Sequence, residues 1–271
     1  MQQSITRRVL VGLAGWTVTL ALCFPILWMV LSSFKTEVQA IDSRSLFWFH
    51  PDLSAYRDVI TRSHYWWFAS NSLIDSVGAT LVALLFAIPA AYAMAFRPSR
   101  RTRSTLLWML STKMMPSVGG LIPIYLIFRS AGLLDTCTGL VIINAVMNLP
   151  IVVWMLFTFF KEIPVEIMES GRMDGANLWH ELGYLLVPLA LPGIAATAFL
   201  SIILCWNEAF WSLNLTAVQA APLTQFIMSF ASPKALFLSK LSATSTMAVV
   251  PVLILGWISL GQLMRGLGGT R

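Results

Sequence analysis

Charged residues are scarce in this sequence. Only 11% of its 271 residues are Asp, Glu, Lys or Arg, whereas 57% are hydrophobic. Soluble globular domains carry about 25% charged residues, so the composition excludes a soluble protein. Several apolar runs exceed the roughly 18 residues that favour a membrane-spanning helix. The composition therefore predicts an integral membrane protein.

The residue patterns of catalytic and metal sites are also missing. No Gly-Lys pair occurs anywhere, so the chain lacks the P-loop that binds the phosphates of ATP. The three histidines are scattered, and the three cysteines are widely separated without metal-ligand spacing. No G-x-S-x-G nucleophile elbow is present. We therefore expect no catalytic apparatus, no metal and no cofactor bound by this chain.

The basic residues are clustered at particular places along the chain. They contribute to a formal net charge of +6, but they form no stripe that would bind nucleic acid. The clusters are Arg7 and Arg8 before the first apolar run, and Arg97, Arg100, Arg101 and Arg103 between the second and third. The positive-inside rule predicts that both clusters lie on the cytoplasmic side of the membrane.

Six apolar segments are predicted to span that bilayer. They cover residues 9–33, 71–96, 105–128, 139–160, 187–213 and about 243–263. The first is too long for a signal peptide and is taken as a retained span. An even number of spans puts both termini in the cytoplasm. No short-period repeat occurs, so the predicted fold is one all-α integral membrane domain over residues 1–271.

Some residues in these spans are polar. Asp75, near the outer end of span two, is expected at the membrane interface. Lys113 lies in span three, just before a Pro116 and a Gly119-Gly120 pair that predict an irregular helix. A lysine within a span faces the bundle interior or a water-filled cavity, or it extends its side chain to the cytoplasmic surface. Both interpretations of Lys113 are open.

A polar insert of mixed charge, about residues 161–186, separates spans four and five. Because such a segment cannot lie in hydrocarbon, it faces water. Pro164 suits the first turn of a helix, and Gly175 suits the left-handed position that follows a helix. Asn177 can cap a second helix from Leu178 to Tyr184. The insert is therefore predicted to be a helix, a glycine bend and a second helix.

This insert resembles the EAA signature of ABC importer permeases, which reads E-A-A-x-x-x-G, nine residues, I-x-L-P. Glu169, Gly175 and Pro188 match outright, and the spacing matches throughout. The substitutions are Ser170 and Gly171 for the two alanines, Leu185 for Ile and Val187 for Leu. Asp174-Gly175-Ala176 matches the D-G-A of the carbohydrate branch. The alternative is an ordinary solvated loop.

The resemblance implies that the insert is a cytoplasmic coupling helix seated in a cleft of an ATP-hydrolysing subunit. Glu169 would pair with a basic side chain there, Gly175 would make the bend, and Met168 and Met173 would pack in the cleft. The implied coupling residues are Met168, Glu169, Ser170, Gly171, Met173, Asp174, Gly175, Ala176 and Pro188. ATP and Mg would be bound by two ATP-binding subunits.

The family also implies a second permease subunit, a separate solute-binding protein and a place in the bacterial cytoplasmic (inner) membrane. Trp206-Asn207-Glu208 resembles the W-N-E of sugar importer permeases. Candidate substrate-path residues are Lys113, Met115, Asn148, Trp206, Asn207 and Glu208, with interhelical hydrogen bonding as the alternative role of the polar ones. The glycine-rich tail from Arg265 to Gly269 is expected near the ATPase subunits.

The sequence thus predicts the transmembrane subunit of an ATP-driven sugar, polyol or glycoside importer. The stretch Ser111–Pro116 with Ile122–Tyr125 looks most like polyol permeases. An ion-coupled secondary transporter, with Glu208 as its carboxylate, is a second hypothesis, and a membrane scaffold subunit is a third. Neither of these explains the spaced pattern of the insert.

Overall fold

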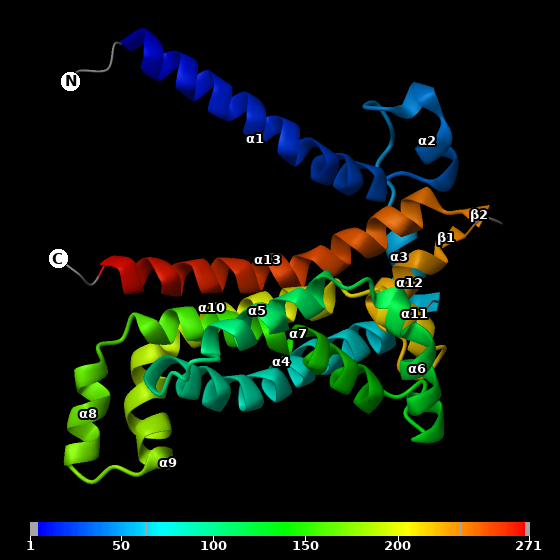
Figure 1. Cartoon of the computed structure of the whole chain (residues 1–271). Helices are drawn as coiled ribbons and strands as arrows, with labels where there is room; N and C mark the ends of the chain where they lie inside the picture. The colour runs from blue at the N-terminus through cyan, green and yellow to red at the C-terminus, as the bar shows by residue number, and fades with distance from the viewer. Residues whose placement is uncertain (1–4, 63, 233–234, 269–271) are drawn as a thin grey trace. The chain divides into compact units, whose positions relative to one another are not determined.

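Helices form nearly all of the computed structural model, which describes residues 5–62, 64–232 and 235–268 (Figure 1). The chain divides into two compact units. The first comprises Met1–Trp66 and Ile227–Val250, and the second comprises Trp67–Phe226 and Pro251–Arg271. The single membrane domain expected over residues 1–271 stays a prediction.

The first unit joins the ends of long helices to short elements. Its elements are α1 (Ile5–Ser33), α2 (Glu37–Ile41), the 3-10 turn η1 (Ser43–Ser45), α3 (Ser54–Arg62), the strands β1 (Ala231–Ser232) and β2 (Ala235–Leu236), and the first part of α13 (Leu238–Gly268). The strands pair antiparallel, with Ala231 opposite Leu236. The Glu37 carboxylate accepts hydrogen bonds from the backbone N–H groups of Ser239 (3.1 Å) and Lys240 (3.0 Å), so α2 caps the start of α13.

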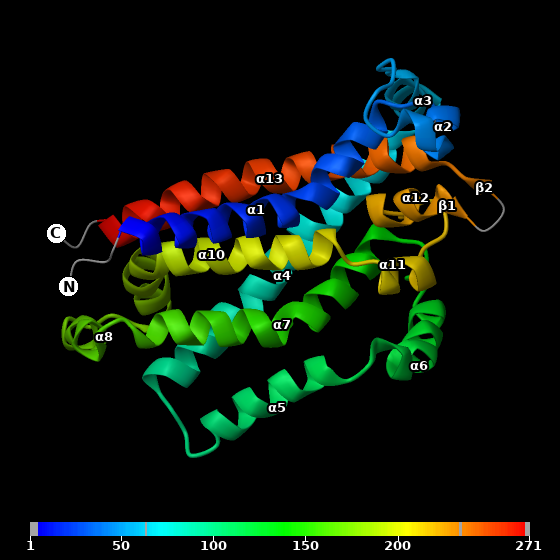
Figure 2. The ribbon, with the colours of Figure 1, turned by 90° about the horizontal axis from the view of Figure 1, so that it is seen from above.

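The second unit contains most of the remaining helices (Figure 2). They are α4 (Tyr65–Phe96), which begins in the first unit, α5 (Thr102–Met114), α6 (Ser117–Ser130), α7 (Cys137–Lys161), α8 (Val165–Met173), α9 (Leu178–His180), the π-helical segment η2 (Glu181–Leu186), α10 (Val187–Trp206), α11 (Phe210–Leu215) and α12 (Leu223–Ser229), which ends in the first unit. Helices α7 and α10 lie side by side. At Gly193 of α10, an added Cβ would overlap the Phe159 ring of α7, so only glycine permits this approach.

Five helices of the described chain are long and apolar enough to cross a membrane: Val11–Ser33, Tyr65–Phe96, Cys137–Lys161, Leu178–Trp206 and Leu238–Trp257. The all-α membrane class is confirmed. The third predicted span, residues 105–128, is divided between α5 and the shorter apolar helix α6. The chain is extended at Met115 and Pro116, with ψ of 128° and 127°. Proline has no N–H and disfavours helical conformation in the residue before it, so the helix stops at Met114.

One face of α4 carries the packing of the second unit. Its buried residues recur at helical spacing: Asn71, Ser72, Asp75, Ser76, Ala79, Thr80, Ala83, Ala87 and Ala91. The alanines let neighbouring helices approach closely. Asp75 belongs to this face, and its expected place at the membrane interface stays a prediction. Only 3% of this residue is exposed, because it belongs to the buried stripe and accepts a hydrogen bond from Asn144 of α7 (2.8 Å).

The loop between α6 and α7 is fastened to the segment after α11 by Asp135. The carboxylate accepts hydrogen bonds from the backbone N–H groups of residues 217–220 at 2.9–3.2 Å. Asp135 has φ of 53°, a left-handed conformation that Asp tolerates better than most residues. Partial burial opposes ionisation, but the four backbone donors outweigh it and hold the pKa of Asp135 below its usual value.

We expect Asp135→Asn to lower stability at neutral pH by about 1–3 kcal/mol, since it weakens charge-assisted hydrogen bonds but keeps a residue that accepts positive φ. A pKa lowered by folding contributes stability above the unfolded value of about 3.9 and loses it as pH falls through the folded pKa. The difference in apparent melting temperature between wild type and variant should therefore shrink on acidification. Glu162→Gln, at an exposed position, is the control. Equal melting temperatures at neutral pH would contradict this role of Asp135.

Candidate functional site

The polar insert has the predicted helix, bend and second helix. Helix α8 is followed by Gly175 with φ of 84°, the left-handed value that glycine adopts without strain. The Asn177 side chain then accepts the His180 backbone N–H at 3.0 Å and caps α9. Pro164 precedes α8 as its N-cap, one position earlier than expected.

The sequence predicted that the second helix ends at Tyr184, but in the structure the helix continues beyond this residue. The chain stays helical from Leu178 to Trp206, through η2 and into α10. Pro188 lacks an N–H for the regular i to i−4 pattern, and in η2 the N–H of Val187 reaches back five residues to the Leu182 carbonyl. The wider π-helical turn thus lets the insert continue into span five without a break.

A buried network, which the sequence did not reveal, ties this insert to α4. Arg172 of α8 makes a two-pronged contact with Glu181 of η2, Nε to Oε1 at 3.0 Å and Nη2 to Oε2 at 3.1 Å. The Tyr92 hydroxyl of α4 donates to the same carboxylate and accepts from the Arg172 guanidinium at 3.0 Å. Glu181 is only 2% exposed. A guanidinium fork on a carboxylate fixes distance and orientation together.

The contacts in this network stabilise the charged forms of Arg172 and Glu181. The hydrogen bonds from Arg172 to Glu181 and to Tyr92 raise the pKa of Arg172 above its already high value, so the side chain stays cationic. Because Glu181 is buried, removal of its cation would leave an unpaired charge in the protein interior. The network therefore holds α8, η2 and α4 in a fixed orientation relative to one another.

The predicted coupling residues separate into buried and exposed groups. Met168 is fully buried in the core of the second unit, so its side chain has no free surface for a partner, in contrast to its expected role. Gly171 packs under Leu185, whose Cδ1 fills the space of an alanine methyl. Ala176 and Pro188 lie half-buried and exposed, respectively. The exposed residues around the bend are Glu169, Ser170, Met173, Asp174 and Gly175.

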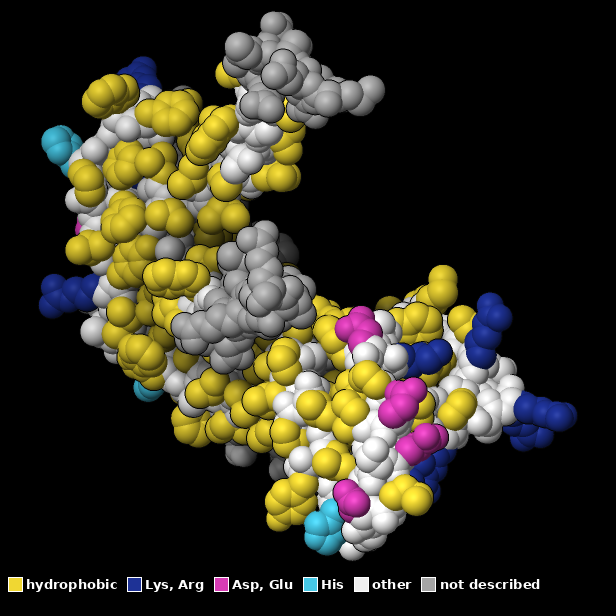
Figure 3. Space-filling model, turned by 90° about the vertical axis from the view of Figure 1, so that its left-hand side faces the viewer, with side chains coloured by type: hydrophobic (Ala, Val, Ile, Leu, Met, Phe, Trp, Pro, Cys, Tyr) yellow, Lys and Arg dark blue, Asp and Glu magenta, His cyan; other side chains and the backbone are white. Residues whose placement is uncertain are grey.

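Figure 3 shows that acidic and basic side chains gather at the end of the second unit that carries α8 and α9, whereas hydrophobic side chains dominate elsewhere on this face. Met173 is 89% exposed beside them. This exposed surface combines charged side chains with apolar ones, among them Met173 and Trp179 (77% exposed), which suits contact with another protein.

A small polar cavity brings together four of the six substrate-path residues. It has a volume of about 180 Å³ and is lined by Lys113, Met115, Asn148 and Glu208, among others. The Lys113 amine donates to the Asn148 Oδ1 at 3.2 Å, so this lysine points toward α7. Asn148 in turn donates to Cys205 of α10 at 3.1 Å. The geometry favours the cavity interpretation of Lys113.

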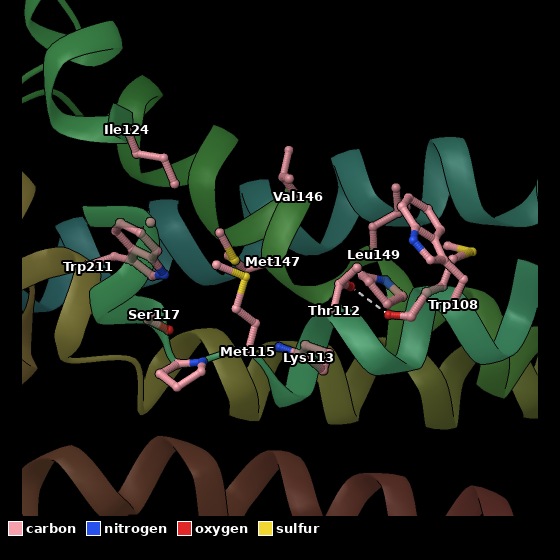
Figure 4. Close-up of a pocket in the computed structure, with 14 residues that line it drawn as sticks. Trp108, Thr112, Lys113, Met115, Ser117, Ile124, Val146, Met147, Leu149 and Trp211 are labelled. Carbon is pink, nitrogen blue, oxygen red and sulfur yellow. Dashed lines mark hydrogen bonds between the residues drawn. The ribbon is translucent and has the colours of Figure 1, made fainter. Parts of the chain in front are cut away.

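A larger, mainly apolar pocket of about 410 Å³ adjoins this cavity (Figure 4). Lys113, Met115 and Trp211 line both spaces, and Trp108 lies at the far end of the larger one. The break between α5 and α6 borders these pockets, because Met115 lines both and Pro116 lines the larger one. Together they offer an ammonium group, amides, a carboxylate and indole rings.

Of the Trp206-Asn207-Glu208 trio, only Glu208 lines the polar cavity. Glu208 accepts the backbone N–H groups of Trp211 (2.8 Å) and Ser212 (3.1 Å), so it caps α11 as well as lining the polar cavity. Asn207 donates to the Ile203 carbonyl within its own helix at 2.9 Å and is exposed. Neither Asn207 nor Trp206 lines the two pockets.

Sequence reasoning missed Asn144 in the wall of the polar cavity and the buried Asp75 that it contacts. Asn144 lines the cavity and donates to Asp75, whose other carboxylate oxygen, Oδ1, is buried without a hydrogen-bond partner among the described residues. The helical spacing of Asn71, Asp75 and Ala79 was the available signal, because it places Asp75 on the small-residue face of α4. Among the described residues, no group of three His, Cys, Asp or Glu side chains lies close enough to hold a metal ion.

Comparison with known proteins identifies the family. Residues 83–263 match the family described as "Binding-protein-dependent transport system inner membrane component". The diacetylchitobiose uptake system permease protein DasC of Streptomyces coelicolor is 27% identical, over 94% of this chain and 93% of DasC. The trehalose transport system permease protein SugB of Mycobacterium tuberculosis is 31% identical, over 73% of this chain and 72% of SugB. The chain belongs to this family of ABC transporter permeases.

The fold is shared with a solved structure. A chain of a bacterial ABC transporter involved in the import of the acidic polysaccharide alginate superposes with a TM-score of 0.78. The two chains are 23% identical, and the match covers 96% of this chain and 99% of that one. The two chains therefore share one fold.

We expect Glu181→Ala to loosen the insert, because it leaves the Arg172 cation without its carboxylate and removes the acceptor of the Tyr92 hydroxyl. Amide hydrogen exchange in α8, residues 165–173, should become faster by about tenfold or more, since the lost contacts contribute on the order of 2 kcal/mol. Glu169→Ala, an exposed change on the same helix, should leave exchange nearly unchanged. Equal exchange in wild type and Glu181→Ala would show that the network does not hold α8.

Proposed function

We propose that this permease is the transmembrane subunit of an ATP-driven carbohydrate importer and forms half of its translocation path. The observation that carries the proposal is the exposed EAA-type insert built onto a rigid joint, since such an insert serves to receive force from another subunit. The carbohydrate relatives and a cavity rich in hydrogen-bonding groups support the substrate class.

The proposed coupling runs through α8. Glu169, Ser170, Met173, Asp174 and Gly175 present the exposed surface to a cleft on an ATP-binding subunit, where Glu169 pairs with a basic side chain. Met168, Gly171 and Ala176 hold α8 on its own chain instead. Because Arg172 and Glu181 lock α8 to η2, movement of α8 is passed to α10 as a rigid-body displacement. Closure of two ATP-binding subunits then switches the cavity between outward and inward access.

The polar cavity is proposed as a part of the sugar path. Carbohydrate hydroxyl groups donate and accept hydrogen bonds, which the Lys113 amine, the Asn148 amide and the Glu208 carboxylate match. Trp211 offers an aromatic face beside them. Sugar, glycoside and polyol ligands all present this chemistry, and the polyol subclass stays a prediction.

The remaining partners follow from this role. A second permease subunit supplies the other half of the path, and a solute-binding protein delivers the carbohydrate. ATP and Mg are bound by the two ATP-binding subunits. The complex resides in the bacterial cytoplasmic membrane, with the termini, the arginine cluster and the insert on the cytoplasmic side.

The coupling role is tested with the complete complex in proteoliposomes. Glu169→Ala should reduce solute-stimulated ATP hydrolysis and uptake by about tenfold or more, because it removes a charged contact worth roughly 1.5–3 kcal/mol at the interface. Gly175→Pro should do the same, since proline cannot adopt φ of 84°. Glu162→Gln, outside the bend, should retain both activities.

Uptake that persists in both variants would refute this coupling route. Uptake without any ATP-binding subunit would instead support an ion-coupled secondary transporter. A scaffold subunit would show neither uptake nor stimulated hydrolysis in any variant, including wild type.

The proposed substrate path makes a separate prediction. Lys113→Gln should raise the KM for uptake several-fold and leave basal ATP hydrolysis unchanged, because it removes one charged hydrogen-bond donor from the cavity but leaves the insert intact. Asn207→Ala is the matched control, since Asn207 belongs to the same family motif as Glu208 but lies outside the cavity. An unchanged KM for Lys113→Gln would remove this lysine from the path.

A further inference from the structure

The second unit contains another cavity, at the end where α4 stops, α5 starts and α7 stops. Its volume is about 500 Å³. Its lining residues include Arg100, Arg103, Leu107, Trp154, Phe157 and Lys161. None of these residues lines the substrate-path pockets, so the proposed transport role does not account for it.

The inner wall of this cavity is apolar. Leu106 is buried in the core of the unit, whereas Leu107 is 54% exposed and continues the wall outward along α5. Trp154 and Phe157 of α7 form the opposite side and are half-buried. A wall of two leucines, an indole and a phenyl ring matches hydrocarbon rather than a small polar ligand.

The rim, by contrast, is cationic. Arg100, Arg103 and Lys161 are exposed there, and none of the three forms a salt bridge among the described residues. The Lys161 amine lies 5.5 Å from the centre of the Phe157 ring, so it is held at the boundary between rim and wall. Three cations without acidic partners on one rim repel one another and favour a shared anion.

We propose that this cavity binds an anionic phospholipid. Guanidinium groups bind phosphate oxygens in a two-pronged geometry, so Arg100 and Arg103 would hold the headgroup phosphate, assisted by Lys161. An acyl chain would lie along Leu107, Trp154 and Phe157. The cavity opens where apolar helices end in basic residues, which is the depth at which a phospholipid passes from hydrocarbon to phosphate.

The apolar wall decides between a lipid and a free phosphate ion. A phosphate ion would contact only the rim and would leave the wall exposed to water. One lipid molecule contacts both the apolar wall and the cationic rim. Its acyl chain lies inside, along the wall, and its phosphate lies outside, at the rim. The same wall would accept an apolar helix of a partner protein, but the unpaired cations would then need acidic partners on that helix.

The test measures lipid binding to the purified complex in neutral detergent by native mass spectrometry during titration with phosphatidylglycerol. Near a membrane surface, each cation contributes enough free energy for about a fivefold change in affinity. Arg100→Gln with Arg103→Gln should therefore weaken binding on the order of tenfold or more. Arg101→Gln is the matched control, because Arg101 lies in the same loop but does not line the cavity.

Phosphatidylcholine, which carries no net charge, should bind much more weakly, and excess inorganic phosphate should not displace phosphatidylglycerol. Displacement by inorganic phosphate would overturn the proposal in favour of a phosphate site. Equal weakening by Arg101→Gln would also overturn it, since general surface charge would then explain binding. Binding is measured without transport, so failure here is distinct from failure of the importer role.

Discussion

The Glu181 carboxylate is the point on which the functional end of this protein depends. It is almost completely buried, and burial of a charge is costly unless a cation and hydrogen bonds satisfy it. Arg172 and Tyr92 meet that requirement from two different helices. The need to satisfy one carboxylate thus fixes the orientation of α8 against η2 and α4. Movement of the exposed surface of α8 can be passed to α10 only if α8 is held in this way.

A second constraint acts along α4. Its buried stripe changes from polar residues in its first half to alanines in its second half, and both halves pack against other helices of the second unit. The alanines permit close approach, whereas Asp75 introduces a carboxylate whose Oδ1 lacks a partner among the described residues. Asn144 lines the polar cavity and donates to Asp75, so the stripe that packs the helices also orients one polar side chain of the cavity wall.

The two proposed ligand sites of the second unit use opposite designs. The sugar path is small, internally polar and lined by side chains that already bond to one another. The lipid cavity has an apolar wall and a rim of unpaired cations. These designs match their ligands, because carbohydrates present polarity on all sides, whereas a phospholipid separates its charge from its hydrocarbon. Residues on both sides of Pro116 line the first site, and Arg100 of the basic loop before α5 lines the second.

The sequence by itself determined the membrane class, most spans, the capped glycine bend and the family, because composition, helical periodicity and turn chemistry are local properties. It also placed Lys113, Asn148 and Glu208 among the substrate-path candidates, which the fold gathers in one cavity. Tertiary structure decided which residues meet across the chain. It paired Arg172 with Glu181 and buried Met168 and Asp75 in the interior. It also placed Glu208 in the wall of the polar cavity and left Asn207 outside that cavity. The burial of Met168 and Asp75 depends on contacts between helices that are far apart in the sequence. Arg172 and Glu181 lie only nine residues apart, but no local pattern specifies which buried charge will find which partner.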